Sequence, residues 1–210
     1  MKIENFFLAV LSILVFTACD SDNDGPVLDE VASDTVANLF APQSGGQDQG
    51  PISGEFTKFD FATGLETTSA TDWDIAFRGT AIIINGGASL GTIDEPERTG
   101  NGAAYIATGT FVSVTEADDS LFVQDSGSGY AIPVGSGNGW YTYEFMTNTI
   151  EPIPGRVLVI RTRDNRYAKI EILSYYKDAP EQITPEIAAD DLRYYTFNYA
   201  YQPNEGVAQF

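Results

Sequence analysis

The stretch WYTYEFMTNTIEPIPG, residues 140–155, contains Met146, the only methionine of the chain apart from the initiator residue. A thioether is a soft ligand for metal centres, and the chain offers almost no other, because it has no histidine and a single cysteine. Tyr143 and Phe145 make the segment typical of a β-strand, in which a methionine usually fills gaps in a core. On residue type alone, Met146 is therefore either a soft metal ligand or core filler.

The absence of histidine excludes a Ser-His-Asp triad, a Cys-His pair and an H-E-x-x-H zinc helix. Paired carboxylates leave one route to catalysis open: Asp72 and Asp74 flank Trp73 and would suit a two-carboxylate hydrolase, although we expect them to be solvated or to cap turns. The net charge of −19 argues against binding nucleic acid or anionic lipid, which both require a basic surface. The chain is predicted not to be an enzyme.

The elements that must position these residues are predicted to be strands. From Phe56 onward, short apolar and aromatic runs are broken by Gly, Asn, Asp and Pro, and in FTKFDF the alternation puts Phe59 and Phe61 on one face. The only helix-like stretch is the short TPEIAADDL, residues 184–192. This pattern predicts an all-β fold, a single domain of antiparallel sheets over residues 52–210.

The clearest unit is RVLVIRTRDNRYAKIEILSYY, residues 156–176, which is predicted to form a β-hairpin. Asp164 and Asn165 at its centre tolerate the positive φ that a tight turn needs. A later aromatic run, YYTFNYAYQ at residues 194–202, is expected to close a sheet. In the second strand of the hairpin, alternation predicts a buried face of Ala168, Ile170 and Ile172 and a solvent-facing side of Lys169 and Glu171.

The N-terminus resembles a targeting signal. Residues 1–18 carry Lys2 and then an apolar run that is too short to span a bilayer. The run ends in VFTAC, which resembles a bacterial lipobox and predicts that Cys19 is lipidated; the alternative is a plain secretory signal with an unpaired cysteine. Residues 19–51, rich in Asp, Gly, Gln, Ser and Pro without an apolar period, are predicted to be a lipidated flexible tether.

Four blocks of sequence, taken together, resemble the HmuY family of haem-binding surface lipoproteins from Bacteroidetes. The resemblance spans most of residues 56–203 and implies an all-β domain with a ligand cleft at one end of the sheets, formed by loops and strand ends. It also implies capture of haem, without catalysis, and its transfer to an outer-membrane receptor. The blocks, in the family's order, are TDWDIAFRGTAIIINGG (71–87), WYTY (140–143), IPGRVLVIRTRDNRYAKIEILSYYKD (153–178) and YYTFNYAYQP (194–203).

The residues that follow Cys19 indicate a location for the protein. DSDNDG, residues 20–25, directly follows Cys19 and resembles the surface-export signal of Bacteroidetes lipoproteins. Together with the lipobox, it predicts a protein anchored by lipid to the outer membrane and exposed at the cell surface. Acyl chains on one residue hold a protein durably at a membrane.

The family resemblance also suggests candidate haem-binding residues. Many relatives carry histidine where this chain has Asn148, and some use methionine instead. Met146 is two residues away and, on a strand, would face the same side, so it is the candidate axial ligand of haem iron. Tyr130, in the Gly-rich SGSGYAIPVGSGNGW, is a weaker second candidate, with loop packing as its alternative. Arg161, together with Arg163, would hold the propionates or pair with surface carboxylates.

Two functions compete with haem binding. The first is an HmuY-like module that has lost haem ligation, as the missing histidines suggest, and that binds another apolar small molecule, a glycan or a protein partner. The second is the carboxylate hydrolase, which the composition permits but nothing else favours.

Overall fold

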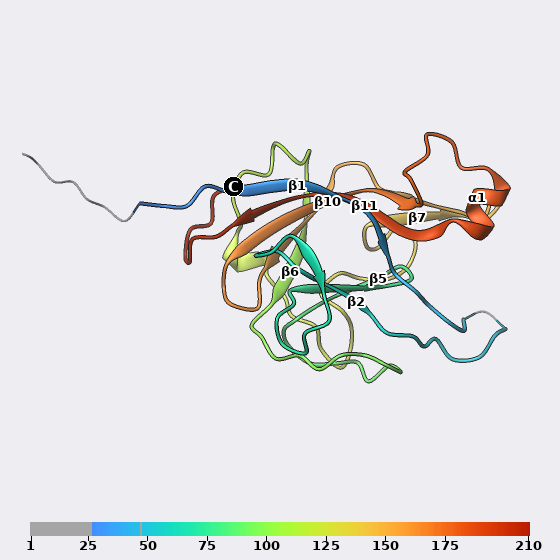
Figure 1. Cartoon of the computed structure of the whole chain (residues 1–210), viewed down its shortest axis with the longest axis horizontal. Helices are drawn as coiled ribbons and strands as arrows, with labels where there is room; N and C mark the ends of the chain where they lie inside the picture. The colour runs from blue at the N-terminus through green and yellow to red at the C-terminus, as the bar shows by residue number, and fades with distance from the viewer. Residues whose placement is uncertain (1–26, 47) are drawn as a thin grey trace, which may run out of the picture.

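The computed structural model describes residues 27–46 and 48–210. Cys19, the signal segment 1–18 and the first part of the expected tether lie outside this range. The predicted all-β fold is confirmed: the described residues form antiparallel sheets with one short α-helix, in a single domain (Figure 1). No helix of the described part of the chain is long and apolar enough to cross a membrane.

The larger sheet has five strands, all antiparallel to their neighbours. Its order brings the first described strand against the last, so β11 lies inside the sheet rather than closing its edge as the sequence suggested. The predicted hairpin of residues 156–176 is confirmed, and Asn165 in its turn has a φ of 65°. Across the sheet the strands are β1 (Ala32–Phe40), β11 (Leu192–Gln202), β10 (Tyr167–Tyr176), β9 (Arg156–Arg161) and β6 (Ala103–Thr108).

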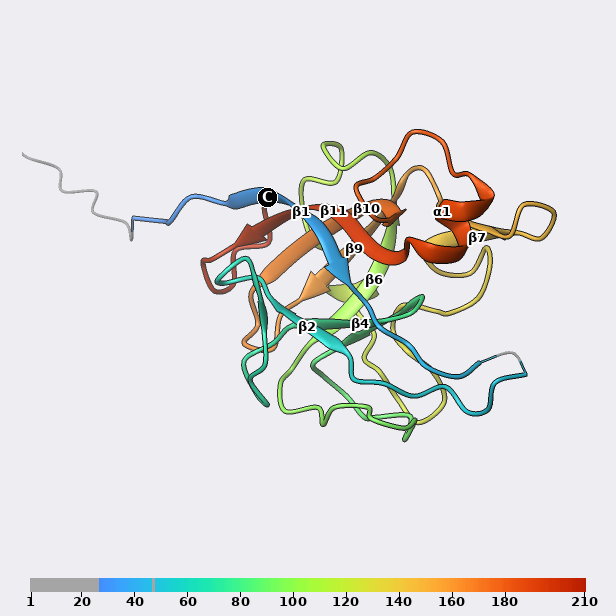
Figure 2. The same ribbon diagram turned by 45° about the vertical axis from the view of Figure 1, so that its right-hand side comes forward.

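The smaller sheet has four strands and lies against one face of the larger sheet (Figure 2). Its central pair β2 and β4 aligns Phe59 with Ile75, and both side chains are fully buried. The order across the sheet is β3 (Leu65–Thr67), β2 (Thr57–Asp60), β4 (Ile75–Arg78) and β5 (Ala81–Ile84).

Three short elements complete the fold. The Thr184 side chain caps the helix α1 (Pro185–Asp190), in agreement with the helix expected near TPEIAADDL. A 3₁₀ turn, η1, spans Asp119–Leu121. The strands β7 (Tyr141–Glu144) and β8 (Thr149–Pro152) form a separate two-stranded hairpin.

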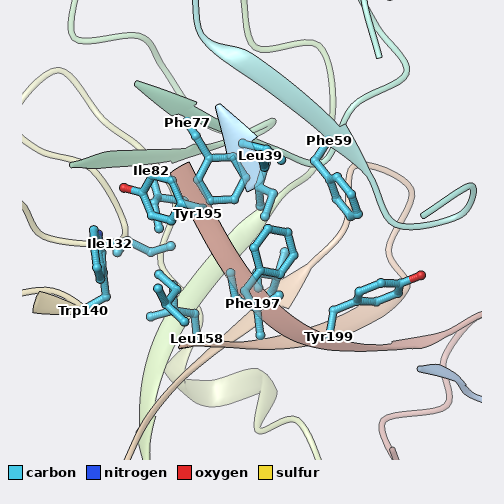
Figure 3. Close-up of a cluster of buried hydrophobic side chains, with 14 of the residues drawn as sticks. Leu39, Phe59, Phe77, Ile82, Ile132, Trp140, Leu158, Tyr195, Phe197 and Tyr199 are labelled. Atoms are coloured by element: carbon cyan, nitrogen blue, oxygen red, sulfur yellow. The ribbon is translucent and has the colours of Figure 1, made fainter. Parts of the chain in front are cut away.

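The main core fills the space between the two sheets (Figure 3). Aromatic rings from both sheets meet there: Phe77 stacks on Phe197 with ring centroids 5.6 Å apart, and Phe59 meets Phe197 edge-on at 5.5 Å. The expectation that Phe59 and Phe61 share a buried face is confirmed, since each is only 1% exposed. Burial of such large rings dominates the stability of a small β-domain.

The flexible tether expected for residues 19–51 is wrong over the range of β1. Ala32–Phe40 pairs with β11 at seven positions, with a bulge between Val36 and Leu39. Leu39 reaches the main core and is 1% exposed. The segment has the polar composition of a linker because its outer face is solvated, but the backbone of β11 provides the partner that holds it in place.

The face of β10 that was expected to be exposed to solvent is also buried by other residues. Lys169 is 5% exposed, and its Nζ donates to the backbone oxygens of Phe111 (2.8 Å) and Val114 (2.6 Å). The rings of Phe111 and the C-terminal Phe210 lie near the same ammonium group. A second, smaller core therefore packs on the outer face of the large sheet, while Ala168, Ile170 and Ile172 are buried as predicted.

Candidate functional site

Met146 does not lie on a strand, which corrects the expectation from its neighbours. β7 ends at Glu144 and β8 begins at Thr149, so Phe145 and Met146 lie in the four-residue turn of the hairpin. Their side chains are 79% and 85% exposed. The core-filler interpretation is wrong, and the thioether is free to meet a ligand. In both views this hairpin lies at the end of the molecule opposite the start of β1, and Figure 2 shows that it projects there (Figures 1 and 2).

Asn148 ends the same turn, so it does not share a strand face with Met146. Its φ is 56°, in the left-handed region that asparagine tolerates better than most residues. Its Oδ1 accepts a hydrogen bond from the Tyr143 hydroxyl at 2.8 Å. Asn148 therefore shapes the turn that presents Met146.

The base of the hairpin is fixed to the rest of the fold. The Arg156 guanidinium donates to the backbone oxygens of Gly137 (2.8 Å) and Gly139, and the Trp140 indole N–H donates to the oxygen of Thr80 at 3.0 Å. Trp140 is buried against Tyr175 and Tyr195. The tip is thus exposed on a base that is held rigidly.

A groove of about 440 Å³ lies between β8 and the second half of β10. β9 pairs with β10 only as far as Ile170, so the residues of β10 after it have room on that side. The Ile150 N–H donates to the Tyr176 hydroxyl at 2.8 Å and ties the two walls together. The lining is mainly Ile150–Pro154 and Glu171–Tyr176, closed by Pro180, Glu181 and Ile183.

A second hollow, the apolar cleft, has a volume of about 560 Å³ and shares no lining residue with the groove. Tyr130 is one of its lining residues. Burial raises the pKa of the Tyr130 phenol, so the hydroxyl stays protonated at neutral pH and is not the phenolate that ferric iron prefers. Met146 is a lining residue of neither the groove nor the apolar cleft, so the structure does not bring Tyr130 and Met146 into one pocket.

Arg161 lies away from both hollows. Its guanidinium stacks on the Phe122 ring, 5.5 Å from the centroid, and its Nε donates to the oxygen of Asn101 at 3.3 Å. Arg161 is the last residue of β9, whereas the β7–β8 hairpin connects to the first residue of β9, Arg156. Arg161 therefore lines neither the groove nor the apolar cleft, and its role as a partner of haem propionates stays a prediction.

Arg163 is committed to a buried ion pair. Its Nη1 lies 2.9 Å from Asp60 Oδ1 and 3.1 Å from Asp74 Oδ1. Burial raises the pKa of Asp74 to about 6. Asp72, by contrast, is exposed and accepts hydrogen bonds from Ser69 and Thr71 in a turn. The two carboxylates that flank Trp73 do not converge on a shared site, so the hydrolase loses its candidate pair.

The groove and the hairpin tip fit haem in two respects. Isoleucine, leucine and proline form the apolar part of the groove lining, and an exposed thioether lies four residues before its first lining residue, Ile150. In a third respect the fit is poor, because the charged lining residues Glu151, Glu171 and Glu181 are acidic. No cluster of His, Cys, Asp or Glu able to hold a metal ion occurs within residues 27–46 and 48–210.

Sequence reasoning missed the groove and the importance of Arg78. The groove depends on where β9 stops pairing with β10, which no local pattern encodes. Arg78 follows the strand-like run WDIAF. An arginine is usually expected to reach solvent, yet Arg78 is only 3% exposed.

Comparisons with known proteins give a family and a set of similar structures. Residues 53–188 match the family described as HmuY protein, whereas no curated protein matches the chain. A structure from Bacteroides fragilis, described as a lipoprotein, is 16% identical with a TM-score of 0.46, covering 83% of this chain and 90% of that one. A structure from Bacteroides vulgatus, described as an HmuY-like haem-binding protein, is 14% identical with a TM-score of 0.47, covering 83% of this chain and 93% of that one. The apo form of an HmuY analogue from Tannerella forsythia is 14% identical with a TM-score of 0.43, covering 84% and 99%.

Proposed function

Because the chain belongs to the HmuY family, we propose that it is a non-catalytic haem-binding protein that holds haem at its hairpin end. Membership of this family supports a general role in haem binding but does not identify the residues that would hold the haem. The observation that carries the proposal for this chain is the exposed thioether of Met146, presented by a rigidly held hairpin whose second strand lines a groove of mixed polar and apolar residues.

Each part of the site has a distinct role in this proposal. When bound, haem supplies an iron centre that a thioether can coordinate. Met146 offers that thioether, and Phe145 beside it, 79% exposed, offers an apolar surface to a macrocycle. Ile150, Ile153 and Leu173 in the groove exclude water from the ligand. Asn148 and Tyr143 keep the turn in its shape through their hydrogen bond.

The charges at the groove decide how an anionic ligand would be oriented. Haem carries two carboxylates, and the charged groove residues Glu151, Glu171 and Glu181 are of the same sign. Like charges repel, so the propionates face solvent and the apolar edge of the ring enters the groove. This arrangement makes binding sensitive to salt and to the loss of one glutamate.

We propose further that Cys19 is lipidated and anchors the protein to the outer membrane, with the domain exposed at the cell surface. The lipobox-like VFTAC supports this, as does the position of the hairpin at the end opposite the start of β1 (Figures 1 and 2). A ligand held at that end would be directed away from the anchor, toward an outer-membrane receptor that accepts it. Mass spectrometry of the mature protein tests this: a Cys19→Ala variant without acyl chains should be soluble, and an unmodified wild-type Cys19 contradicts the proposal.

Titration with haemin tests the haem proposal directly. We expect a shifted Soret band that saturates at one equivalent, with tighter binding after reduction, because a thioether prefers ferrous iron. Met146→Leu retains the apolar volume and removes the sulfur, so ferrous binding should weaken while the melting temperature stays unchanged. Thr147→Ala, in the same turn, is the matched control.

The alternative function, binding of another apolar molecule, a glycan or a protein by a module without haem ligation, is favoured by the absence of histidine. It makes a different prediction in the same titration. A broad band that never saturates, identical for wild type and Met146→Leu, would reject haem as the ligand.

A further inference from the structure

The apolar cleft that contains Tyr130 has aliphatic walls that are open to solvent. Residues from four separate segments line it, among them Ile52, Leu90, Ile93 and Val134. Each of these four side chains keeps between 36% and 49% of its surface exposed. A concave, exposed apolar surface on a soluble domain is typical of a binding site. The proposed haem ligand Met146 is not part of it.

Arg78 brings a positive charge to this cleft. It is 3% exposed, and its guanidinium lies over the Phe56 ring at 4.2 Å. Nη1 donates to the backbone oxygens of Gly54 and Ile93, and Nη2 donates to Thr92 Oγ1 at 2.9 Å. All three acceptors are neutral. A guanidinium has five N–H groups, so Nε–H and one Nη2–H remain for a ligand.

Two other arginines with largely buried side chains, Arg98 and Arg163, have carboxylate partners. Arg98 Nη2 lies 2.7 Å from Glu95 and 2.9 Å from Asp125, and Arg163 pairs with Asp60 and Asp74 as described above. Within the described part of the chain, no carboxylate oxygen lies within 4.0 Å of the Arg78 guanidinium. Glu95 and Asp94 attract this charge from a greater distance, but neither forms a direct ion pair with it. A buried charge without a direct partner is costly, and a bound carboxylate would reduce that cost.

From this combination we infer that the apolar cleft is a second binding site, for a medium-chain aliphatic carboxylate whose head group pairs with Arg78. The aliphatic walls match an acyl chain rather than a planar ring, because Tyr130 is the only aromatic residue of the lining. The protonated Tyr130 hydroxyl can donate to the same carboxylate. This site does not depend on the haem proposal.

Calorimetric titration of the full chain with sodium decanoate below its micelle concentration tests the inference. We expect one equivalent to bind, and decanol and decylamine to bind about tenfold more weakly or less, since they lack the anion. Val134→Trp fills the rim of the cleft without touching Arg78 and should weaken decanoate binding by about tenfold or more. Arg78→Gln should do the same, but it also removes the bonds to Gly54 and Ile93, so Val134→Trp is the decisive variant.

The possible outcomes separate this site from the haem site. If decanol binds as tightly as decanoate, or if Val134→Trp binds decanoate normally, the inference is wrong. Met146→Leu should bind decanoate like wild type, and Val134→Trp should bind haemin like wild type. Loss of haemin binding in Val134→Trp would instead make the cleft a haem site, and co-sedimentation with phosphatidylglycerol vesicles that Val134→Trp abolishes would make it a lipid-surface contact; either result overturns the inference.

Discussion

Arg163 in the β9–β10 turn and Asp74 just before β4 form an ion pair, with Nη1 and Oδ1 3.1 Å apart, that joins the two sheets. The Asp74 carboxylate is held from three sides, because it also accepts the backbone N–H groups of Phe61 (2.9 Å) and Arg163 (3.1 Å). Even so, burial dominates and raises its pKa from 3.8 to about 6.

This ion pair predicts a pH dependence of stability. Between pH 4 and 6 the folded chain holds a proton on Asp74 that the unfolded chain has lost, so the free energy of unfolding falls as pH rises through this window. For Asp74→Asn this contribution is absent. We therefore expect the difference in unfolding free energy between wild type and Asp74→Asn to change by about 2 kcal/mol between pH 4 and pH 6.5. Urea unfolding at several pH values measures it, and a constant difference contradicts it. Asp72→Asn, at the exposed neighbouring carboxylate, is the matched control.

Replacement of Asn148 by histidine is expected to create a nitrogen ligand beside Met146. Ferric haem should bind more tightly, and the gain should disappear below about pH 6, where imidazole is protonated. The cost in stability should be small, about 1 kcal/mol, because histidine also tolerates the left-handed φ of this position. Asn148→Gly suits the same φ without offering a ligand, so visible spectra of the two variants should differ. Identical spectra would mean that position 148 does not face the iron.

Haem binding is expected to strengthen with salt, contrary to the usual behaviour of anion sites. The chain carries a net charge of −19, and raising the salt from about 0.01 M to 1 M shortens the Debye length from about 30 Å to 3 Å. Glu181→Gln, in the groove lining, should tighten binding at low salt and have no effect at high salt. Equal affinity for wild type and Glu181→Gln at low salt would place the propionates elsewhere.

β1 is expected to be required for folding, although its composition is that of a linker. Leu39→Ala should cost about 2–5 kcal/mol of unfolding free energy, because the side chain is fully buried in the main core. Ser33→Ala on the exposed face of the same strand should cost little. Removal of residues before 32 should leave the melting temperature unchanged, whereas removal through Phe40 should expose the edge of β11 and cause aggregation. A stable, monomeric chain lacking β1 would contradict this expectation.

Local patterns were sufficient to predict much of the fold. The hairpin of β9 and β10 was predictable because Asn165 tolerates a positive φ and because Ala168, Ile170 and Ile172 alternate along one buried face. The cover over Lys169 was not predictable, because its partners Phe111 and Val114 are more than 50 residues away. β1 was missed for a similar reason: its partner, β11, is at the other end of the chain.

The candidate site was predicted less well than the fold. The apolar and aromatic residues around Met146 predicted a continuous strand. That prediction failed because β-propensity reflects packing against neighbouring residues, and the exposed turn of the hairpin has no such packing. The positive φ tolerance of Asn148 was the available sign of a turn. Met146 is nevertheless an accessible thioether. It was proposed as a ligand because of its side-chain chemistry, so the wrong strand assignment did not affect that choice. The separation of Tyr130 and Arg161 from it depends on tertiary structure alone.

The way in which β1 joins the large sheet determines how the domain would resist being pulled by an anchor. Residues 27–31 continue outward from the start of β1 (Figure 1), and β1 lies antiparallel to β11 over seven paired positions. A force applied through these residues acts along the strand, so the pairs are sheared together rather than peeled apart one at a time. The bulge before Leu39 and the burial of that side chain oppose sliding of the strand in register. Resistance to such a force depends on the rate of unfolding rather than on the equilibrium free energy, so a surface protein attached at this end would withstand tension from flowing liquid by mechanical strength.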